Sequence, residues 1–301
     1  MLSAMSLRLT YLSRPVKRKN GQPPSSFCLQ GGLYRGRRAP GVSYLPSRLS
    51  RRKKPISRLH SAGAFDSRPE AGRARQRNHG RGVELKPIGR LHVLTDQELQ
   101  GRFTHLELAE LAIAGGADTI QFRQKNGCTR QLIETARQMR ETCARAGVAF
   151  IVNDRLDVAL ACGADGVHLG QDDFPIGLAR TWLGEEKIIG GSAANLAEAL
   201  ACREQGADYV GFGPVFPTAS KDDAGPVSGL ETLSEVARRL GMPVIAIGGI
   251  GKKNAAEVMG AGAHGIAVIS AVCCQPDPAE ATRRLVMACG IKQNPPGLRG
   301  F

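Results

Sequence analysis

The segment Ala149–Asp173, with the sequence AFIVNDRLDVALACGADGVHLGQDD, decides how this chain folds. It contains an apolar run at Ala149–Asn153, then a helical pattern, then a second apolar run at Gly166–Leu169. Gly163-Ala164-Asp165 separates the helical pattern from the second run, and its glycine suits the left-handed residue that closes a helix. A strand, a helix and another strand in this order predict a parallel sheet covered by helices.

The same unit recurs along the chain. Related tripeptides at Gly116–Asp118, Gly206–Asp208 and Gly262–His264 also stand between a helical pattern and an apolar run. Eight strands are predicted, at Leu91–Thr95, Asp118–Arg123, Ala149–Asn153, Gly166–Leu169, Lys187–Gly190, Tyr209–Phe212, Val244–Ile247 and Gly265–Ile269. Eight strand–helix units in about 200 residues predict a single (β/α)₈ TIM barrel of the α/β class, with a doubly wound sheet as the alternative.

Two helix starts can be read from capping residues. Leu132, Ala136 and Met139 line one face of a helix for which Thr129 is the predicted cap. Asp277 is the predicted cap of the last helix, with Pro278 at the first helical position.

The positive charge of the chain is confined to its first part. Residues 1–90 hold 21 Lys and Arg against three acidic residues, although the whole chain has 41 Lys and Arg against 27 Asp and Glu. The remainder is therefore mildly acidic, which argues against nucleic acid as its partner. Residues 1–82 lack a hydrophobic period and predict a disordered basic leader before a barrel at 83–290 and a flexible tail at 291–301.

Three interpretations of the leader compete. It is an artefactual upstream extension of the reading frame, an organelle transit peptide rich in Arg and Ser, or a basic nucleic-acid-binding tail. No apolar stretch approaches the ~20 residues that span a bilayer, so no membrane association is expected. The eight cysteines form no C-x-x-C pair and predict reduced, buried thiols. We therefore expect a cytoplasmic location, or an organellar one if the leader is a transit peptide.

Polar residues cluster where the predicted strands end. Seven of the eight strands are followed by such residues: Gln121, Arg123 and Lys125; Asn153 and Asp154; His168, Gln171, Asp172 and Asp173; Ser192; Thr218, Ser220 and Lys221; Gly248–Gly251; and Ser270. In a TIM barrel these ends converge on the face that carries the active site. Arg123, Lys125 and Lys221 suit anionic oxygens. Gly248–Gly251 and Ser270 match the phosphate cradle of such barrels.

Two carboxylates suggest a metal. Asp154 and Asp173 follow adjacent strands and together could hold one Mg²⁺, with phosphate oxygens and water as further ligands. The alternatives are an ion pair of Asp154 with Arg155 or Arg123, and a helix cap formed by one of Asp172 and Asp173. His168 is either a catalytic residue or a hydrogen-bonded core histidine. Cations, a metal and a phosphate cradle together predict metal-assisted departure of a diphosphate.

Six motifs lie in order along the body: QFRQK at Gln121–Lys125, ND at Asn153-Asp154, DGVHLGQDD at Asp165–Asp173, GPVFPT at Gly213–Thr218, IGGI at Ile247–Ile250 and ISA at Ile269–Ala271. Together they resemble the motifs of the thiamine phosphate synthase family, and the resemblance covers residues 89–290. It implies a transferase of thiamine diphosphate biosynthesis. Such an enzyme condenses 4-amino-2-methyl-5-(diphosphooxymethyl)pyrimidine with a thiazole phosphate and releases thiamine phosphate and pyrophosphate.

The resemblance also implies residue roles. The pyrimidine diphosphate would be bound by Gln121, Phe122, Arg123, Gln124, Lys125, Asn153, Ser192 and Lys221, and the thiazole phosphate by Thr218, Ala219, Ser220, Gly249, Ile269 and Ser270. Asp154 and Asp173 would hold one Mg²⁺ per site. In the family, pyrophosphate leaves first and the thiazole nitrogen captures the resulting cation. Arg123, Lys125 and Lys221 would be catalytic by stabilising the leaving charge.

Two departures from the family pattern bear on the alternatives. Ser220 replaces a common threonine but keeps the hydroxyl, and Ala194 stands where the family often has a histidine. A related thiazole tautomerase would need a proton-transfer group, which Ala194 cannot supply. A non-catalytic regulatory or nucleic-acid-binding protein and another phosphate-handling barrel, such as those of tryptophan synthesis, are the remaining alternatives. A homo-oligomer stays open, and we expect the Gly213–Gly225 loop to close over the ligands.

Overall fold

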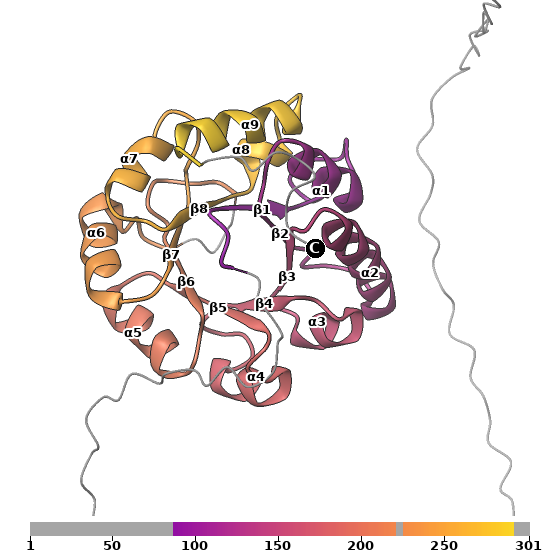
Figure 1. Cartoon of the computed structure of the whole chain (residues 1–301), viewed down its shortest axis with the longest axis horizontal. Helices are drawn as coiled ribbons and strands as arrows, with labels where there is room; N and C mark the ends of the chain where they lie inside the picture. Colours follow the sequence, from indigo (N-terminus) through magenta and orange to yellow (C-terminus); the bar gives the residue numbers. More distant parts are fainter. Residues whose placement is uncertain (1–86, 221–224, 292–301) are drawn as a thin grey trace, which may run out of the picture. The chain divides into compact units, whose positions relative to one another are not determined.

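Eight parallel strands form a closed barrel in the order β1 to β8 (Figure 1). The computed structural model describes residues 87–220 and 225–291. The predicted leader at 1–82, Lys221 and the tail beyond residue 291 lie outside the described residues. The strands are β1 Leu91–Thr95, β2 Thr119–Phe122, β3 Ala149–Asn153, β4 Gly166–Leu169, β5 Ile188–Ala193, β6 Tyr209–Phe212, β7 Val244–Ile247 and β8 Gly265–Val268. Because β1 pairs with both β2 and β8, the TIM barrel is confirmed and the doubly wound sheet is excluded.

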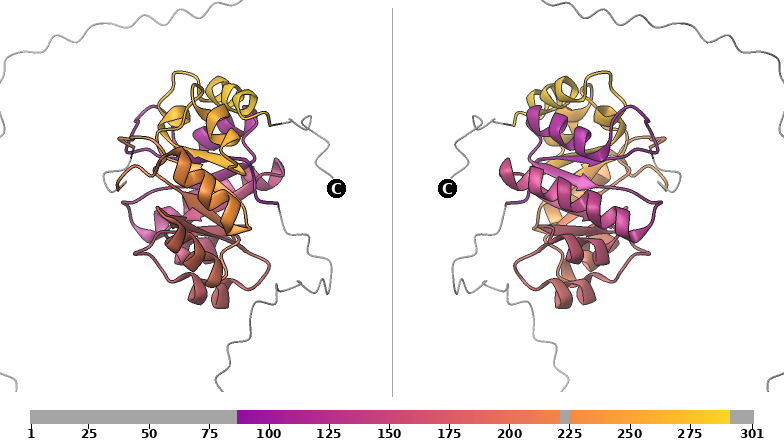
Figure 2. Two further views of the ribbon diagram at one scale, coloured as in Figure 1. Left: turned by 90° about the vertical axis from the view of Figure 1, so that its left-hand side faces the viewer. Right: turned by 90° about the vertical axis from the view of Figure 1, so that its right-hand side faces the viewer.

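Helices surround the barrel on its outer side (Figures 1 and 2). They are α1 His105–Ala114, α2 Thr129–Arg145, α3 Leu156–Cys162, α4 Ile176–Leu183, α5 Leu196–Glu204, α6 Gly229–Leu240, α7 Ala255–Gly260, α8 Ser270–Cys273 and α9 Pro278–Ala288. The larger core cluster lies between the strands and these helices, with Phe150, Val210 and Leu233 among its fully buried side chains. None of the described helices is long and apolar enough to cross a membrane.

The two predicted helix starts have different outcomes. The Asp277 side chain accepts a hydrogen bond from the Glu280 amide at 2.9 Å, and Pro278 is the first residue of α9, as predicted. Thr129 is not a cap: it is the first residue of α2, and Cys128 is the cap residue, without a side-chain hydrogen bond. The Thr129 hydroxyl instead accepts a hydrogen bond from the Arg155 guanidinium at 3.0 Å.

Strand β5 is longer than predicted because its two glycines do not form a turn. Gly190 and Gly191 continue in register beside Tyr209 and Val210 of β6. A Cβ atom at Gly190 would overlap the Tyr209 ring and the His168 imidazole, which fill the barrel at this height. The glycines therefore make room for larger neighbours inside the barrel, and Ser192 becomes part of the strand.

The repeated tripeptides close helices and hold the N-terminal ends of the strands. All four glycines have positive φ angles: 97° at Gly116, 68° at Gly163, 95° at Gly206 and 96° at Gly262. The aspartates that follow accept hydrogen bonds from backbone amides in the preceding strand or just before it: Asp118 from Arg90 and Leu91, Asp165 from Phe150, and Asp208 from Ile189. In the fourth copy, the His264 ring contacts the Ile88 carbonyl at 3.0 Å. These side chains fix the even-numbered strands against their neighbours.

Polar side chains also occupy the inside of the barrel. The His168 Nδ1 atom lies 2.9 Å from the Tyr209 hydroxyl, and its Nε2 atom lies 3.0 Å from the Ser192 hydroxyl. This is the hydrogen-bonded core histidine named as the alternative above. The seven cysteines in the described part of the chain are all free thiols, and most are buried. Burial raises the pKa of the Cys273 thiol to about 12, which keeps it protonated at neutral pH.

Candidate active site

A cavity of about 760 Å³ opens at the C-terminal ends of the strands. It brings together most of the predicted site residues: Arg123, Lys125, Asn153, Asp154, Asp173, Ser192, Thr218, Ala219, Ser220, Gly249, Ile269 and Ser270. Ala194 also lines this cavity. The volume falls in the range of cavities that hold small organic ligands. The strand ends therefore converge on one cavity, as predicted.

Three residues of the QFRQK motif, Gln121, Phe122 and Gln124, do not line this cavity. Gln121 points into the barrel and lines a smaller cavity of about 20 Å³, which shares Asn153 and Ser192 with the main one. Phe122 points outward and packs its ring against His105 with 4.8 Å between ring centroids. Gln124 also points outward, where its side chain bonds to His105 at 2.7 Å. Only Arg123 and Lys125 of this motif reach the main cavity.

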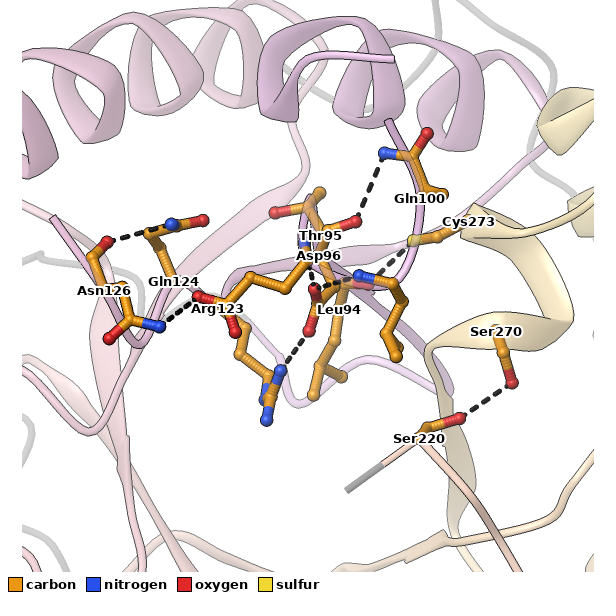
Figure 3. Close-up of polar contacts among 12 residues, drawn as sticks. Leu94, Thr95, Asp96, Gln100, Arg123, Gln124, Asn126, Ser220, Ser270 and Cys273 are labelled. Atoms are coloured by element: carbon orange, nitrogen blue, oxygen red, sulfur yellow. Dashed lines mark hydrogen bonds and ion pairs between the residues drawn. The ribbon is translucent and has the colours of Figure 1, made fainter. Parts of the chain in front are cut away.

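Arg123 forms a buried ion pair with Asp96, a residue that the sequence analysis missed (Figure 3). Asp96 follows β1 directly, and its side chain is 2% exposed. The other oxygen of its carboxylate accepts hydrogen bonds from the backbone amides of Glu98 at 2.8 Å and Leu99 at 3.2 Å. An acidic residue immediately after a predicted strand was the available signal. It places the end of β1, the one strand for which no site residue was predicted, beside the site.

The two predicted metal ligands lie on the same cavity wall. Asp154 has a φ angle of 63°, a left-handed conformation that side chains rarely adopt and that is more common at functional sites. Asp173 accepts a hydrogen bond from the Gly170 amide at 2.6 Å. Helix α4 begins at Ile176 with Pro175 as its cap residue, so the prediction that Asp172 or Asp173 caps it is wrong.

Asp154 and Asp173 both line the cavity, and the two neighbouring arginines pair with other acidic residues. Arg155 pairs with Asp157 at 2.6 Å, and Arg123 pairs with Asp96. Within residues 87–220 and 225–291, no three acidic, histidine or cysteine side chains form a metal cluster. Magnesium is often held by one or two carboxylates together with substrate phosphates and water. Asp154 and Asp173 fit that arrangement, in which the ligand supplies the remaining oxygens.

The opposite side of the cavity is built from backbone and hydroxyl groups. Gly249 has a φ angle of 63°, and a Cβ atom there would lie 2.5 Å from the Pro217 carbonyl and 2.7 Å from the Phe216 side chain. Only glycine therefore allows the segment after β6 to pass so close to the end of β7. The hydroxyls of Ser220 and Ser270 lie 2.8 Å apart (Figure 3), and Ser270 opens α8. Small residues and hydroxyls of this kind suit a phosphate group.

The cavity offers little for nucleophilic catalysis. Ser192 contacts His168 as in a serine–histidine pair, but the third partner is the Tyr209 hydroxyl. Burial raises the pKa of that hydroxyl, so it remains neutral and cannot stabilise an imidazolium. Cys274 also lines the cavity, and burial raises the pKa of its thiol. The arrangement favours binding of anions over covalent catalysis.

A TIM barrel with cations and carboxylates on one wall of its cavity, and a glycine–serine cradle on the other, defines an enzyme that handles phosphorylated substrates. The family model for thiamine monophosphate synthase matches residues 91–272. The chain belongs to this family.

Individual relatives agree with the family model. A thiamine-phosphate synthase from Methanocella arvoryzae is 57% identical over 195 residues, which are 65% of this chain and 92% of that protein. A thiamine-phosphate synthase from Salinibacter ruber is 54% identical over 199 residues, which are 66% of this chain and 88% of that protein. Among solved structures, a thiamine phosphate pyrophosphorylase from Pyrococcus furiosus superimposes with a TM-score of 0.62 at 44% identity, over 67% of this chain and 95% of that one.

Proposed function

We propose that the protein is a thiamine-phosphate synthase. It is a transferase that condenses 4-amino-2-methyl-5-(diphosphooxymethyl)pyrimidine with a thiazole phosphate to give thiamine phosphate and pyrophosphate. The observation that carries this proposal is the convergence of Arg123, Lys125, Asp154 and Asp173 on one cavity in a chain of this family. The two cationic side chains suit a diphosphate group, and the two carboxylates suit a metal ion bound to that group.

The two substrates bind on opposite walls of the cavity. The pyrimidine diphosphate binds at the ends of β2 to β5, where Arg123, Lys125, Asn153 and Ser192 line the wall. The thiazole phosphate binds at the ends of β6 to β8, where the groups around Ser270 form the cradle. Holding both substrates in one cavity removes much of the entropic cost of bringing the reacting atoms together.

The reaction breaks the bond between the pyrimidine methylene carbon and the diphosphate oxygen. The bonding electron pair leaves with pyrophosphate, and the thiazole nitrogen donates its lone pair to the methylene carbon to form the new bond. Arg123 and Lys125 stabilise the growing negative charge of the leaving group, together with Lys221, which lies outside the described residues. No general base is needed for these steps. The cavity therefore contributes electrostatic stabilisation and orientation.

A magnesium ion fits the chemistry of this site. Asp154 and Asp173 would hold it, with diphosphate oxygens and water as the other ligands. When bound, it supplies positive charge beside the leaving pyrophosphate. The two carboxylates then serve the metal, while Arg123 and Lys125 contact the diphosphate.

The cavity favours the synthase over a thiazole tautomerase. A tautomerase must move a proton, and Ala194 on the cavity wall has no group that can do so. Arg123 and Lys125, together with the carboxylates of Asp154 and Asp173, also favour a substrate that carries a diphosphate.

The partners are the two phosphorylated substrates, and a homo-oligomer stays open. Free thiols suit a reducing compartment, so we place the enzyme in the cytoplasm, or in an organelle if residues 1–82 are a transit peptide.

Product formation by the full chain tests the proposed function. With both substrates and Mg²⁺, we expect thiamine phosphate and pyrophosphate in equal amounts, and neither product when either substrate is omitted. Folded protein that forms no thiamine phosphate would contradict the proposal. Isomerisation of a thiazole carboxylate phosphate without coupling would favour the tautomerase instead.

A further inference from the structure

Strand β1 ends beside the cavity in a buried acid, although its end carries no predicted role in catalysis. Asp96 follows the last residue of β1, and its ion pair with Arg123 joins the ends of two adjacent strands (Figure 3). The Arg123 side chain is 7% exposed and still lines the cavity. The pair therefore lies where the diphosphate of the proposed reaction would bind.

The Asp96 carboxylate is held in a fixed orientation. One oxygen accepts hydrogen bonds from the Glu98 and Leu99 amides, and the other contacts the Arg123 guanidinium. Two amides on one oxygen fix the plane of the carboxylate, which leaves the second oxygen to fix the arginine. A buried guanidinium without a counter-charge would be costly, so Asp96 also makes this position of Arg123 possible.

The loop that carries Asp96 is tied to its surroundings on several sides. Gln100 donates to the Asp96 carbonyl at 3.2 Å and to the Phe103 carbonyl at 2.9 Å. Glu98 accepts a hydrogen bond at 2.7 Å from Asn126, which lies after β2. Cys273 of α8 donates to the Leu94 carbonyl at 3.0 Å. The carboxylate thus stands on a framework built from β1, β2 and α8.

Fixing Arg123 in advance has two consequences for an anionic ligand. An arginine side chain loses rotamer freedom when it is fixed, and a guanidinium that is already fixed loses less on binding. The other carboxylates on this wall include Asp154 and Asp173, which the metal needs. An arginine released from Asp96 could pair with one of them and displace the metal. Asp96 also has an unfavourable effect, because it offsets part of the positive charge with which Arg123 attracts an anionic ligand.

We propose that Asp96 is a positioning residue for Arg123 in the diphosphate subsite, and this inference rests on the proposed function. Asp96 orients the guanidinium toward the cavity and keeps it away from the metal carboxylates. Orientation outweighs the charge that Asp96 offsets, because a small displacement of a group that contacts the leaving group costs up to about 100-fold in rate.

A double-mutant cycle in the full chain tests the inference. We expect Asp96→Asn to lower kcat by about 10- to 100-fold, since the amide cannot accept from both Arg123 and the loop amides, and to change KM for the thiazole phosphate less than about twofold. Arg123→Ala should lower kcat at least as far. Adding Asp96→Asn to Arg123→Ala should cause no further loss beyond about twofold. Asp96→Glu should recover part of the activity.

Asp208→Asn is the matched control. Asp208 pairs with Arg180 at 2.6 Å, and their side chains are 10% and 12% exposed. This pair is also largely buried, but it lies near the start of β6, at the opposite end of the barrel. We expect Asp208→Asn to lower the melting temperature while the kcat of the folded enzyme stays unchanged. Losses in kcat that track the melting temperature in both variants would overturn a positioning role.

Binding of inorganic pyrophosphate separates this inference from the proposed function. By titration calorimetry with Mg²⁺, Asp96→Asn should weaken pyrophosphate binding about tenfold, and not at all when Arg123 is already alanine. This pattern would support the positioning role even if the chain formed no thiamine phosphate, in which case only the proposed function would fail. Losses that multiply in the double variant would overturn the inference, because Asp96 would then act independently of Arg123.

Discussion

The two ends of the barrel use the same residue type for opposite purposes. At the N-terminal end, Asp118, Asp165 and Asp208 direct carboxylate oxygens to backbone amides in the preceding strand or just before it. At the C-terminal end, Asp154 and Asp173 line the cavity. The first group closes hydrogen bonds between strands, and the second offers oxygens to a ligand. Stability and function are thus separated along the barrel axis, as is general for TIM barrels.

The backbone makes the same distinction. Each aspartate of the N-terminal end follows a Gly-Ala pair in which the glycine takes the left-handed conformation. At the C-terminal end, the aspartate Asp154 itself has the left-handed conformation, with a φ angle of 63°. A strained non-glycine residue persists only where the surroundings impose it. The comparison predicts that substitutions at one end change activity and those at the other change stability.

Removal of the metal should have the largest effect. We expect chelation of Mg²⁺ to lower the rate of pyrophosphate release by about 1000-fold, because the charge of the leaving group is then no longer neutralised. Asp154→Ala and Asp173→Ala should each raise the Mg²⁺ concentration needed for half-maximal rate. If the rate in chelator equals that with Mg²⁺ although the metal is shown to be absent, Asp154 and Asp173 do not act as metal ligands in the reaction.

The stability of the barrel should depend on pH through His92, a buried residue of β1 whose Nε2 atom lies 3.1 Å from the Gly89 carbonyl oxygen. Burial lowers the pKa of this histidine to about 4, from 6.5 for an unperturbed side chain. Between pH 6.5 and about 4 the unfolded chain binds more protons, so this contribution is complete above pH 6.5 and is lost as the pH falls. The loss amounts to roughly 3 kcal/mol. Denaturant unfolding at pH 7 and pH 4.5 should show a larger loss in the wild type than in His92→Gln; equal losses would refute the prediction.

Asp118→Ala should reduce stability without reducing turnover. The substitution leaves the amides of Arg90 and Leu91 without their carboxylate partner, which should cost about 2 kcal/mol of unfolding free energy. We expect the kcat of the folded enzyme to stay within about twofold of the wild type. Urea unfolding gives the first quantity, and product formation per folded molecule gives the second. A tenfold loss of kcat would break the separation between the two ends.

Ser270→Ala should have the smallest effect. It removes the hydroxyl that contacts Ser220 and lines the cradle, so KM for the thiazole phosphate should rise by up to about tenfold. KM for the pyrimidine diphosphate should not change, because that substrate binds on the other wall. Steady-state kinetics with each substrate varied in turn measure both constants. An equal rise in both would show that the two walls are not independent.

Much of the fold could be predicted because its signals are local. Five of the strands, including β1 and β3, have the predicted bounds, and the left-handed glycines lie where the repeated tripeptides placed them. The errors in the predicted elements arose where tertiary contacts determine how far a strand extends. The Gly190-Gly191 pair looks like a turn until the Tyr209 and His168 rings occupy the space beside it.

The site was predicted less completely because the sequence shows which residues lie at strand ends but not the direction in which their side chains point. Phe122 and Gln124 belong to a motif of the predicted site, but their side chains contact His105 of α1 instead of lining the cavity. Asp96 was missed because its partner, Arg123, lies 27 residues away in sequence. A contact of that separation leaves no local pattern. The residue roles and the metal stay predictions.

One matched pair of variants tests the separation of the two ends most directly. Asp154→Asn and Asp165→Asn make the same chemical change at the C-terminal and the N-terminal end, and thiamine phosphate formed per folded molecule is the quantity to compare. We predict a loss of about 100-fold or more for Asp154→Asn, and a rate within about twofold of the wild type for Asp165→Asn, whose melting temperature falls instead. Equal rates for the two variants would contradict the account.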